Sequence, residues 1–377
     1  MSYINAEKKL FFKTTILMKI LDRYIAKILL IYTLGVTIVW MGIYAFFNFI
    51  NEIDAIGQHH YTFLSAVIYV VSDLPAVVYS HSSVIILLGC LLALGHLATT
   101  SQLVVIRGFG ISIMQIAKKV VVAAMMFILV VVFLGELIAP ITTKYAEFYK
   151  AKALGQNISA SSQRGFWLKD GDAIINVGRN LDDKTFGDVT LIHLNKTNQL
   201  ESIVYANKVT FDKSHLNFES SKGYQLSQTE KMITIQPKND KKYSVKVSFN
   251  KNLIKALEKD PRELSGWELY KHIDFLSENN LASEHFKIEL YKRFVKPITL
   301  VAMLLISMLF VFGSLRDASL GKKIFLGVVI SLFFELSSRI GSVISLRFDY
   351  DPLFSTSAPT IVVLIIGFIL LKRKSAR

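Results

Sequence analysis

Hydrophobic residues are grouped in long blocks along most of the chain. Six blocks are long enough to cross a bilayer as helices, because a helical span needs about 20 mostly apolar residues. They cover residues 28–50, 63–94, 120–140, 295–315, 324–344 and 353–371. The pattern predicts an α-helical membrane protein with three spans on either side of a long, more polar insert.

The insert between the third and fourth blocks has a different periodicity. Short runs of β-branched and aromatic residues are separated there by Asp, Asn, Lys and Gly, which is typical of strands and turns. The runs cover residues 173–177, 189–194, 203–211, 216–220, 232–236 and 243–249. Six or more short strands at this spacing predict a sandwich, a jelly roll or an open barrel. A helical pattern returns at about Gly266, and residues 284–295 predict an amphipathic helix that leads into the fourth span.

These patterns divide the chain into four regions. Residues 1–17 precede a second natural start, Met18, and are expected to be an extension with little structural role. The first three spans occupy residues 18–143, the β-domain residues 144–283, and the last three spans residues 284–377. The N-terminus has no uninterrupted apolar core or small-residue cleavage site, so a secretory signal peptide is not expected.

Basic residues gather at the ends of the apolar blocks. The formal net charge is +14, but the chain has no arginine-rich arm and no nucleic-acid motif, so nucleic acid is not an expected partner. Lys and Arg are frequent in the N-terminal flank, in the loops after spans two and four and at the C-terminus, and absent from the loop after span one. The positive-inside rule then places both termini in the cytoplasm and the β-domain on the outer side.

Signatures of covalent chemistry are absent from the sequence. No GxxxxGK[ST] phosphate loop occurs, and the similar residues 313–323 have the wrong spacing and lack the Ser or Thr that would hold magnesium. The eight histidines show no metal-ligand spacing, and Cys90 is expected to be a small core residue. We therefore expect no catalytic residue, metal or cofactor on this chain.

Charged residues inside the spans need partners. Glu335 and Arg339 are four residues apart and can pair on one helix face, either as a structural pair or as part of a polar cavity. Glu136 is expected to reach the interface or to cap a neighbouring helix. A basic cluster at the outer ends of spans three and four is either a solvated face or a binding site for a phosphorylated amphiphile. Its members are Lys144, Lys150, Lys152, Lys287, Lys292, Arg293 and Lys296.

The cytoplasmic loop after span two contains a short helical pattern, LATTSQLVVIRGFGIS, residues 97–112. Thr100 or Ser101 is expected to cap the start of the helix, and Gly108 to end it. Leu103, Val104 and Ile106 give it an apolar side. The pattern predicts an ordered helix at about residues 97–108, where a slack turn would suffice to connect two spans.

The order and spacing of these features resemble the LptF/LptG family, the permease subunits of the bacterial lipopolysaccharide exporter. The matching segments are LDRYIAK (21–27), LLGCLLALGHLATTSQLVVIRGFGIS (87–112), ELIAP (136–140), GFWLKDGD (165–172), FKIELYKRFVKPITLVAMLL (286–305) and FVFGSLR (310–316). The LDRYI and WLKDG segments are closer to the LptG side of the family.

The resemblance implies an ABC transporter of the bacterial inner membrane that extracts lipopolysaccharide and passes it to a periplasmic bridge of jellyrolls. It implies a heterodimer with an LptF-like permease, a dimer of an LptB-like ATPase that binds ATP and magnesium, and an LptC-like single-span jellyroll protein. The β-domain of this chain would be a periplasmic β-jellyroll. The helix at residues 97–108 would be the coupling helix that receives the closure of the ATPase.

The resemblance also suggests site residues. The expected ATPase contacts are Ser101, Gln102, Leu103, Val104, Ile106 and Arg107, with Gln102 standing where members commonly carry Glu. The expected substrate contacts are Phe46, Phe47 and Phe49 in span one, Phe333 and Phe334 in span five, and the lysines Lys144, Lys150 and Lys152. At the outer end of span one, Asn48, Asp54 and Ala55 stand where members of the family often carry basic residues. Phosphate binding is therefore expected more from the three lysines than from span one.

Three alternatives stay open. The chain could be the paralogous LptF-type subunit of the same complex. It could be a secondary transporter for an amphiphile, although the sequence shows neither inverted repeats nor broken midplane helices. It could also be a membrane anchor that transmits force without transporting.

Overall fold

The computed structural model describes residues 2–155, 166–170, 172–182, 185–195, 199–212, 215–229, 232–247, 260–278, 283–313, 319–348 and 350–375. The ends predicted for the fourth span, at residue 315, and for the last strand, at residue 249, lie outside these ranges. The side chains of the predicted extension, residues 1–17, are also outside the description, whereas its backbone belongs to the first helix from Ser2 onward.

Within the described residues, six helices are long and apolar enough to cross a membrane. They are α1 (Ser2–Glu52), α2 (Phe63–Thr99), α4 (Ile113–Phe133) with its continuations η2 (Leu134–Ile138) and α5 (Ala139–Ala153), α8 (Glu284–Val311), α9 (Leu320–Phe348) and α10 (Pro352–Ser375). The prediction of six apolar helices with a β-rich insert after the third is confirmed. Each helix is longer than its apolar block, because the flanking polar residues also have helical backbone.

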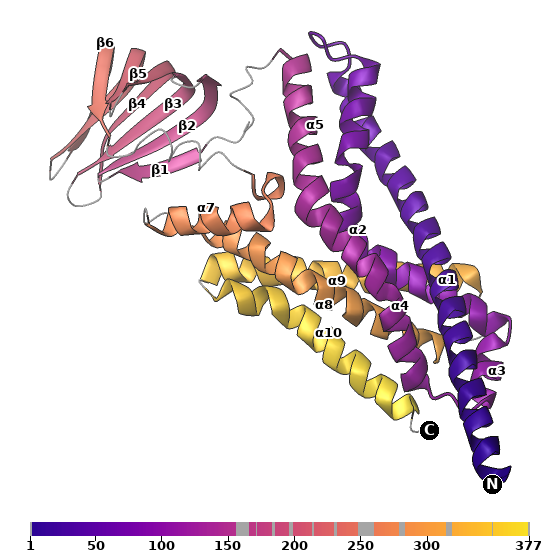
Figure 1. Cartoon of the computed structure of the whole chain (residues 1–377). Helices are drawn as coiled ribbons and strands as arrows, with labels where there is room; N and C mark the ends of the chain where they lie inside the picture. Colours follow the sequence, from indigo (N-terminus) through magenta and orange to yellow (C-terminus); the bar gives the residue numbers. More distant parts are fainter. Residues whose placement is uncertain are drawn as a thin grey trace. The chain divides into compact units, whose positions relative to one another are not determined.

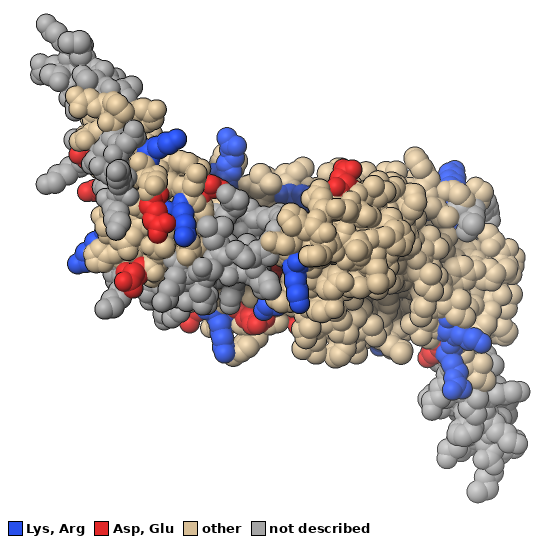
Figure 2. Space-filling view, turned by 90° about the horizontal axis from the view of Figure 1, so that it is seen from above, with Lys and Arg blue, Asp and Glu red and all other residues tan. Residues whose placement is uncertain are grey.

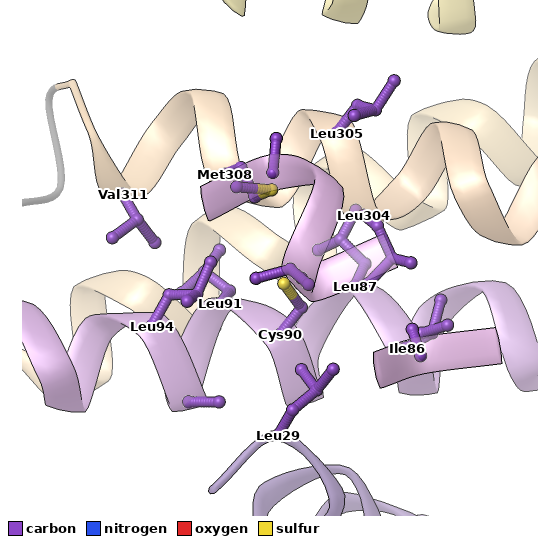
Figure 3. Close-up of a cluster of buried hydrophobic side chains, with 14 of the residues drawn as sticks. Leu29, Ile86, Leu87, Cys90, Leu91, Leu94, Leu304, Leu305, Met308 and Val311 are labelled. Atoms are coloured by element: carbon purple, nitrogen blue, oxygen red, sulfur yellow. The ribbon is translucent and has the colours of Figure 1, made fainter. Parts of the chain in front are cut away.

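The helices pack around a core of Leu, Ile and small residues. Leu87, Cys90 and Leu91 of α2 are fully buried beside Leu304 and Met308 of α8 (Figure 3). The expectation that Cys90 is a core residue is confirmed. Figure 1 shows α8 and α10 side by side, and these two helices are in contact along their length.

The outer surface of the helices is apolar as well. Ile31, Leu34 and Ile38 of α1 are exposed, and so are Val122 and Leu129 of α4. On the face seen in Figure 2, the helices carry few Lys, Arg, Asp or Glu side chains. Lipid is the environment in which such a surface is stable, because it replaces water around the apolar side chains.

The strands of the insert form one antiparallel sheet in the order β1-β2-β3-β4-β5-β6. The strands are β1 (Phe166–Asp170), β2 (Ala173–Asp182), β3 (Thr185–Leu194), β4 (Leu200–Asp212), β5 (His215–Thr229) and β6 (Met232–Lys246). The runs predicted at 232–236 and 243–249 were expected to be separate strands. They belong to one strand, β6, because its polar middle continues the pairing with β5. The jelly roll itself stays a prediction.

The described chain consists of two compact units. The helical unit comprises Met1–Ile50, Val71–Thr142 and Ser265–Arg377, and the β unit comprises Asn51–Val70 and Thr143–Leu264. The helical unit also contains the short helices α3 (Gln102–Gly108) and α7 (Gly266–Glu278), and the β unit contains η1 (Ile53–Ala55) and η3 (Pro261–Glu263). Residues from α7 onward therefore pack with the helices, whereas the predicted β-domain extends to residue 283.

Candidate functional site

The short helix expected at about residues 97–108 is present as α3, Gln102–Gly108, whereas residues 97–99 belong to the end of α2. Its start is built differently from the prediction. Ser101 has a left-handed backbone (φ 60°), and its side chain makes no capping hydrogen bond. The Thr100 hydroxyl donates to the carbonyl of His96 at 2.7 Å, so Thr100 terminates α2 instead of capping α3. The predicted end at Gly108 is confirmed.

Contacts at both ends hold α3 on the helical unit. The Tyr24 hydroxyl of α1 donates to Gln102 Oε1 at 2.8 Å. Leu103 and Ile106 are buried in the core between the helices. After α3, Ser112 and Gln115 form a capping box at the start of α4. α3 is therefore attached to the surrounding helices by a hydrogen bond and by buried side chains.

The exposed side of α3 agrees only in part with the side that the sequence suggested. Leu103 and Ile106 were expected to contact a partner, but both face inward, because residues three apart lie on one side of a helix and this side packs on the core. Val104, Val105 and Phe109 are exposed by 46%, 59% and 72%. Val105 and Phe109 were not among the residues expected to be exposed on α3, because seven residues do not reveal which side of a helix packs inward. Ser101 and Arg107 are exposed as well.

The phenylalanines expected to face substrate lie in different environments. Phe46 and Phe47 are exposed on α1, with their rings edge to face and 5.7 Å between centres, and Phe49 is half-buried. Phe333 is 74% exposed on α9, whereas the neighbouring Phe334 is 7% exposed. Phe334 therefore packs within the chain, and Phe333 offers a free apolar surface.

Phe333 and Phe334 line an apolar groove of about 660 Å³ between α8, α9 and α10. Met303, Ile306 and Phe310 come from α8, and Phe354 and Val362 are among the residues from α10. The lining is almost entirely hydrocarbon, with Ser337, Ser355 and the Tyr350 side chain as its few polar members. A groove of this kind suits an acyl chain or another apolar group.

A polar pocket of about 180 Å³ lies on the same three helices and on α2. Its charged members are Glu289, Lys292, Lys296, Glu335 and Arg339. Arg339 Nε donates to Glu335 Oε1 at 3.2 Å, so the predicted pair forms and also lines a polar cavity. Lys296 Nζ donates to the carbonyl of Ser80 at 2.9 Å. The two interpretations of Glu335 and Arg339, as an ion pair and as part of a polar cavity, are therefore both confirmed.

Lys150, which was expected to bind phosphate, has an ion pair within the β unit. Its Nζ donates to Glu52 Oε1 at 2.7 Å and lies 4.5 Å from the ring centre of Tyr69. Glu52 Oε2 accepts a hydrogen bond from the buried Tyr61 hydroxyl at 2.8 Å. Burial and this bond to Glu52 raise the pKa of Tyr61 above its ordinary value. A phosphate would have to compete with Glu52 for Lys150.

The other two lysines of α5, Lys144 in its first half and Lys152 in its last turn, are exposed. Lys144 is close enough to Glu263 to act on its titration. Burial raises the pKa of Glu263 to about 6, helped by the charges of Asp260 and Glu147 and opposed by Lys144 and Arg262. Lys152 is thus the more available of these cations for a ligand.

Glu136 caps a neighbouring helix, as one of the two expectations stated. Its carboxylate accepts a hydrogen bond from the backbone N–H of Gly266, the first residue of α7, at 2.7 Å. The other oxygen lies 3.6 Å from Arg293 Nη1 of α8. Glu136 sits in the π-helical turn η2, where Gly135 packs directly on the ring of Tyr79. Such π-helical turns are frequent at functional sites.

Comparison with known sequences identifies the family. Residues 23–373 match the family described as lipopolysaccharide export system permease LptF/LptG. The Escherichia coli K12 protein named lipopolysaccharide export system permease protein LptG is 27% identical over 363 residues, covering 94% of this chain and 99% of the relative. A Haemophilus influenzae protein of the same name is 26% identical over 355 residues, covering 94% and 98%. The chain belongs to the LptF/LptG family of lipopolysaccharide export system permeases.

Proposed function

We propose that this chain is the LptG-like permease subunit of an ABC transporter that extracts lipopolysaccharide from the bacterial inner membrane. Its partners would be an LptF-like permease, a dimer of an LptB-like ATPase that binds ATP and magnesium, and an LptC-like single-span jellyroll protein. The support is the likeness along nearly the whole chain to relatives named LptG. Both termini would lie in the cytoplasm and the β unit in the periplasm.

The observation that carries the proposal is the geometry of α3. Its inner side is fixed by Leu103 and Ile106, and its outer side exposes Val104, Val105 and Phe109 beside Arg107. An apolar helix face with a charged rim is a common docking surface for a partner groove. Because α3 is held by buried contacts, a push on it moves the spans instead of being absorbed by a loop.

The path of the lipid needs continuous apolar surface. Exposing acyl chains to water costs about 0.8 kcal/mol for each CH₂ group. Phe46, Phe47 and Phe333 supply exposed apolar area on α1 and α9. In the described sheet, β1 pairs only with β2 and β6 only with β5, so both edges can extend the sheet into a neighbouring jellyroll.

The sharpest test is co-purification of the tagged full-length chain with the ATPase. Val105→Asp places a charge on the exposed side of α3 and is expected to release the ATPase. Val105→Thr, which keeps the side-chain shape without the charge, is expected to retain it. Leu103→Asp is a poor test because Leu103 is buried and the variant would disturb the core. Full retention of the ATPase by Val105→Asp and Val104→Asp would contradict the coupling role.

Substrate contact is tested separately by photocrosslinking lipopolysaccharide to the purified complex. Lys152→Glu is expected to weaken the crosslink, because Lys152 is exposed and adds positive charge at the end of α5. Lys150→Glu is expected to weaken it less directly, through loss of the pair with Glu52. An unchanged crosslink in both variants would exclude these lysines. The identity of the second permease in the complex, determined by mass spectrometry, distinguishes an LptG-like from an LptF-like role.

A further inference from the structure

The polar pocket and the apolar groove share a wall. Phe334 lines both, and α8, α9 and α10 contribute to each. Adjacent residues of α9 line different cavities, because Ser337 lies in the groove and Ser338 in the pocket. Together the two cavities place a charged compartment next to a hydrocarbon compartment. This arrangement matches an amphiphile, which has a charged headgroup and an apolar chain.

The polar pocket has an excess of positive charge. Lys292, Lys296 and Arg339 are its cations, and Glu289 and Glu335 are its carboxylates. Arg339 is paired with Glu335, and Lys296 is directed at a backbone carbonyl. The excess of one cation fits the single negative charge of a phosphodiester, and a charge-assisted hydrogen bond to phosphate is roughly twice as strong as a neutral one.

The two compartments follow each other along α8. The polar lining ends at Thr299 and the apolar lining begins at Met303, a rise of about 6 Å at 1.5 Å per residue. The apolar lining then continues to Phe310. A molecule with its charged group beside Lys292 and Lys296 would therefore extend its chain along α8 into the groove.

We propose that the pocket and the groove together bind one glycerophospholipid of the surrounding bilayer, with its phosphate in the pocket and one acyl chain in the groove. The groove volume of about 660 Å³ is that of a site for one small ligand. The groove volume fits a lipid that places one acyl chain there, whereas lipopolysaccharide carries several acyl chains on one headgroup. The bound lipid is thus distinct from the exported one, and the inference holds whether or not the proposed transport does.

The test uses the full-length chain in detergent with a phosphatidylglycerol probe that carries a diazirine at the end of one acyl chain. Labelling is expected in α8 between Met303 and Phe310. The double variant Lys292→Gln/Lys296→Gln is expected to lower labelling by about tenfold or more, because charged hydrogen bonds to the phosphate are lost. Lys322→Gln, which removes an exposed lysine of α9 outside both cavities, is the matched control and is expected to label normally.

A second variant tests the groove alone. Ala358→Phe adds a ring to its lining and is expected to block labelling, whereas Val122→Phe adds a ring to an exposed position of α4 and is expected to have no effect. This pair decides the question if the lysine variant fails to fold, which size-exclusion chromatography would show.

Competition separates the possible ligands. Unlabelled phosphatidylglycerol is expected to displace the probe, and inorganic phosphate and lipopolysaccharide are not. Displacement by inorganic phosphate would reduce the site to an anion site without a role for the groove. Displacement by lipopolysaccharide at equal concentration would show that the cavities bind cargo. Either result, or normal labelling of Ala358→Phe, would overturn the proposal.

Discussion

Replacing Glu52 with Gln keeps the size of the side chain but removes the charge that Lys150 faces. The amide oxygen of Gln can still accept the hydrogen bond of Tyr61, and the amide NH₂ group then takes the place of the oxygen that pairs with Lys150. Removing one partner of a fully buried pair costs about 3–5 kcal/mol, whereas an exposed pair contributes about 1 kcal/mol or less. The side chains of Glu52 and Lys150 are 9% and 27% exposed, which places this pair between the two cases. We expect a loss of about 2 kcal/mol in the free energy of unfolding.

The assay is denaturant unfolding of the full-length chain in mixed micelles, arranged as a double-mutant cycle with Lys150→Met. The two single variants are expected to destabilise, and the double variant to recover most of the loss, because no uncompensated charge is left. Lys152→Met, at an exposed lysine of the same helix, serves as the control and is expected to add independently. Additivity of Glu52→Gln and Lys150→Met within about 0.5 kcal/mol would refute the reasoning.

Three further predictions concern other contacts. A Cβ at Gly135 would overlap the ring of Tyr79, so Gly135→Ala is expected to lower the free energy of unfolding by about 1–3 kcal/mol, measured in the same assay. Glu136→Ala removes the acceptor for the Gly266 N–H and is expected to speed hydrogen exchange in the first turn of α7, with unchanged exchange as the contrary result. Because the pKa of Glu263 is raised to about 6, the folded state holds this proton more tightly than the unfolded state, and stability is expected to fall as pH rises towards and through 6. Glu263→Gln is expected to remove that fall and to gain up to about 1 kcal/mol above pH 6 after allowance for solvent screening, as checked by unfolding at several pH values.

The membrane helices were predictable because their signal is local. A block of about 20 apolar residues is sufficient to identify a span, whatever packs against it. The π-helical turn η2 and Pro75 inside α2 could not be recognised from hydropathy, because neither of them interrupts an apolar block. Five of the six described strands, β2 to β6, were found for the same reason, through alternation over a few residues. β1 was not predicted, and the polar middle of β6 concealed that two predicted runs form one strand.

The number of apolar helices, the position of the β-rich insert, and the short helix α3 with its end at Gly108 follow from local patterns of residues. Which side chains these elements expose depends on how the elements pack. Leu103 and Ile106 face inward and Val105 and Phe109 outward, because the packing of α3 on the core selects one side. Lys150 meets Glu52 across 98 positions of the chain. The polar pocket likewise joins charges from helices that are separate in sequence, and no local pattern encodes contacts of that range.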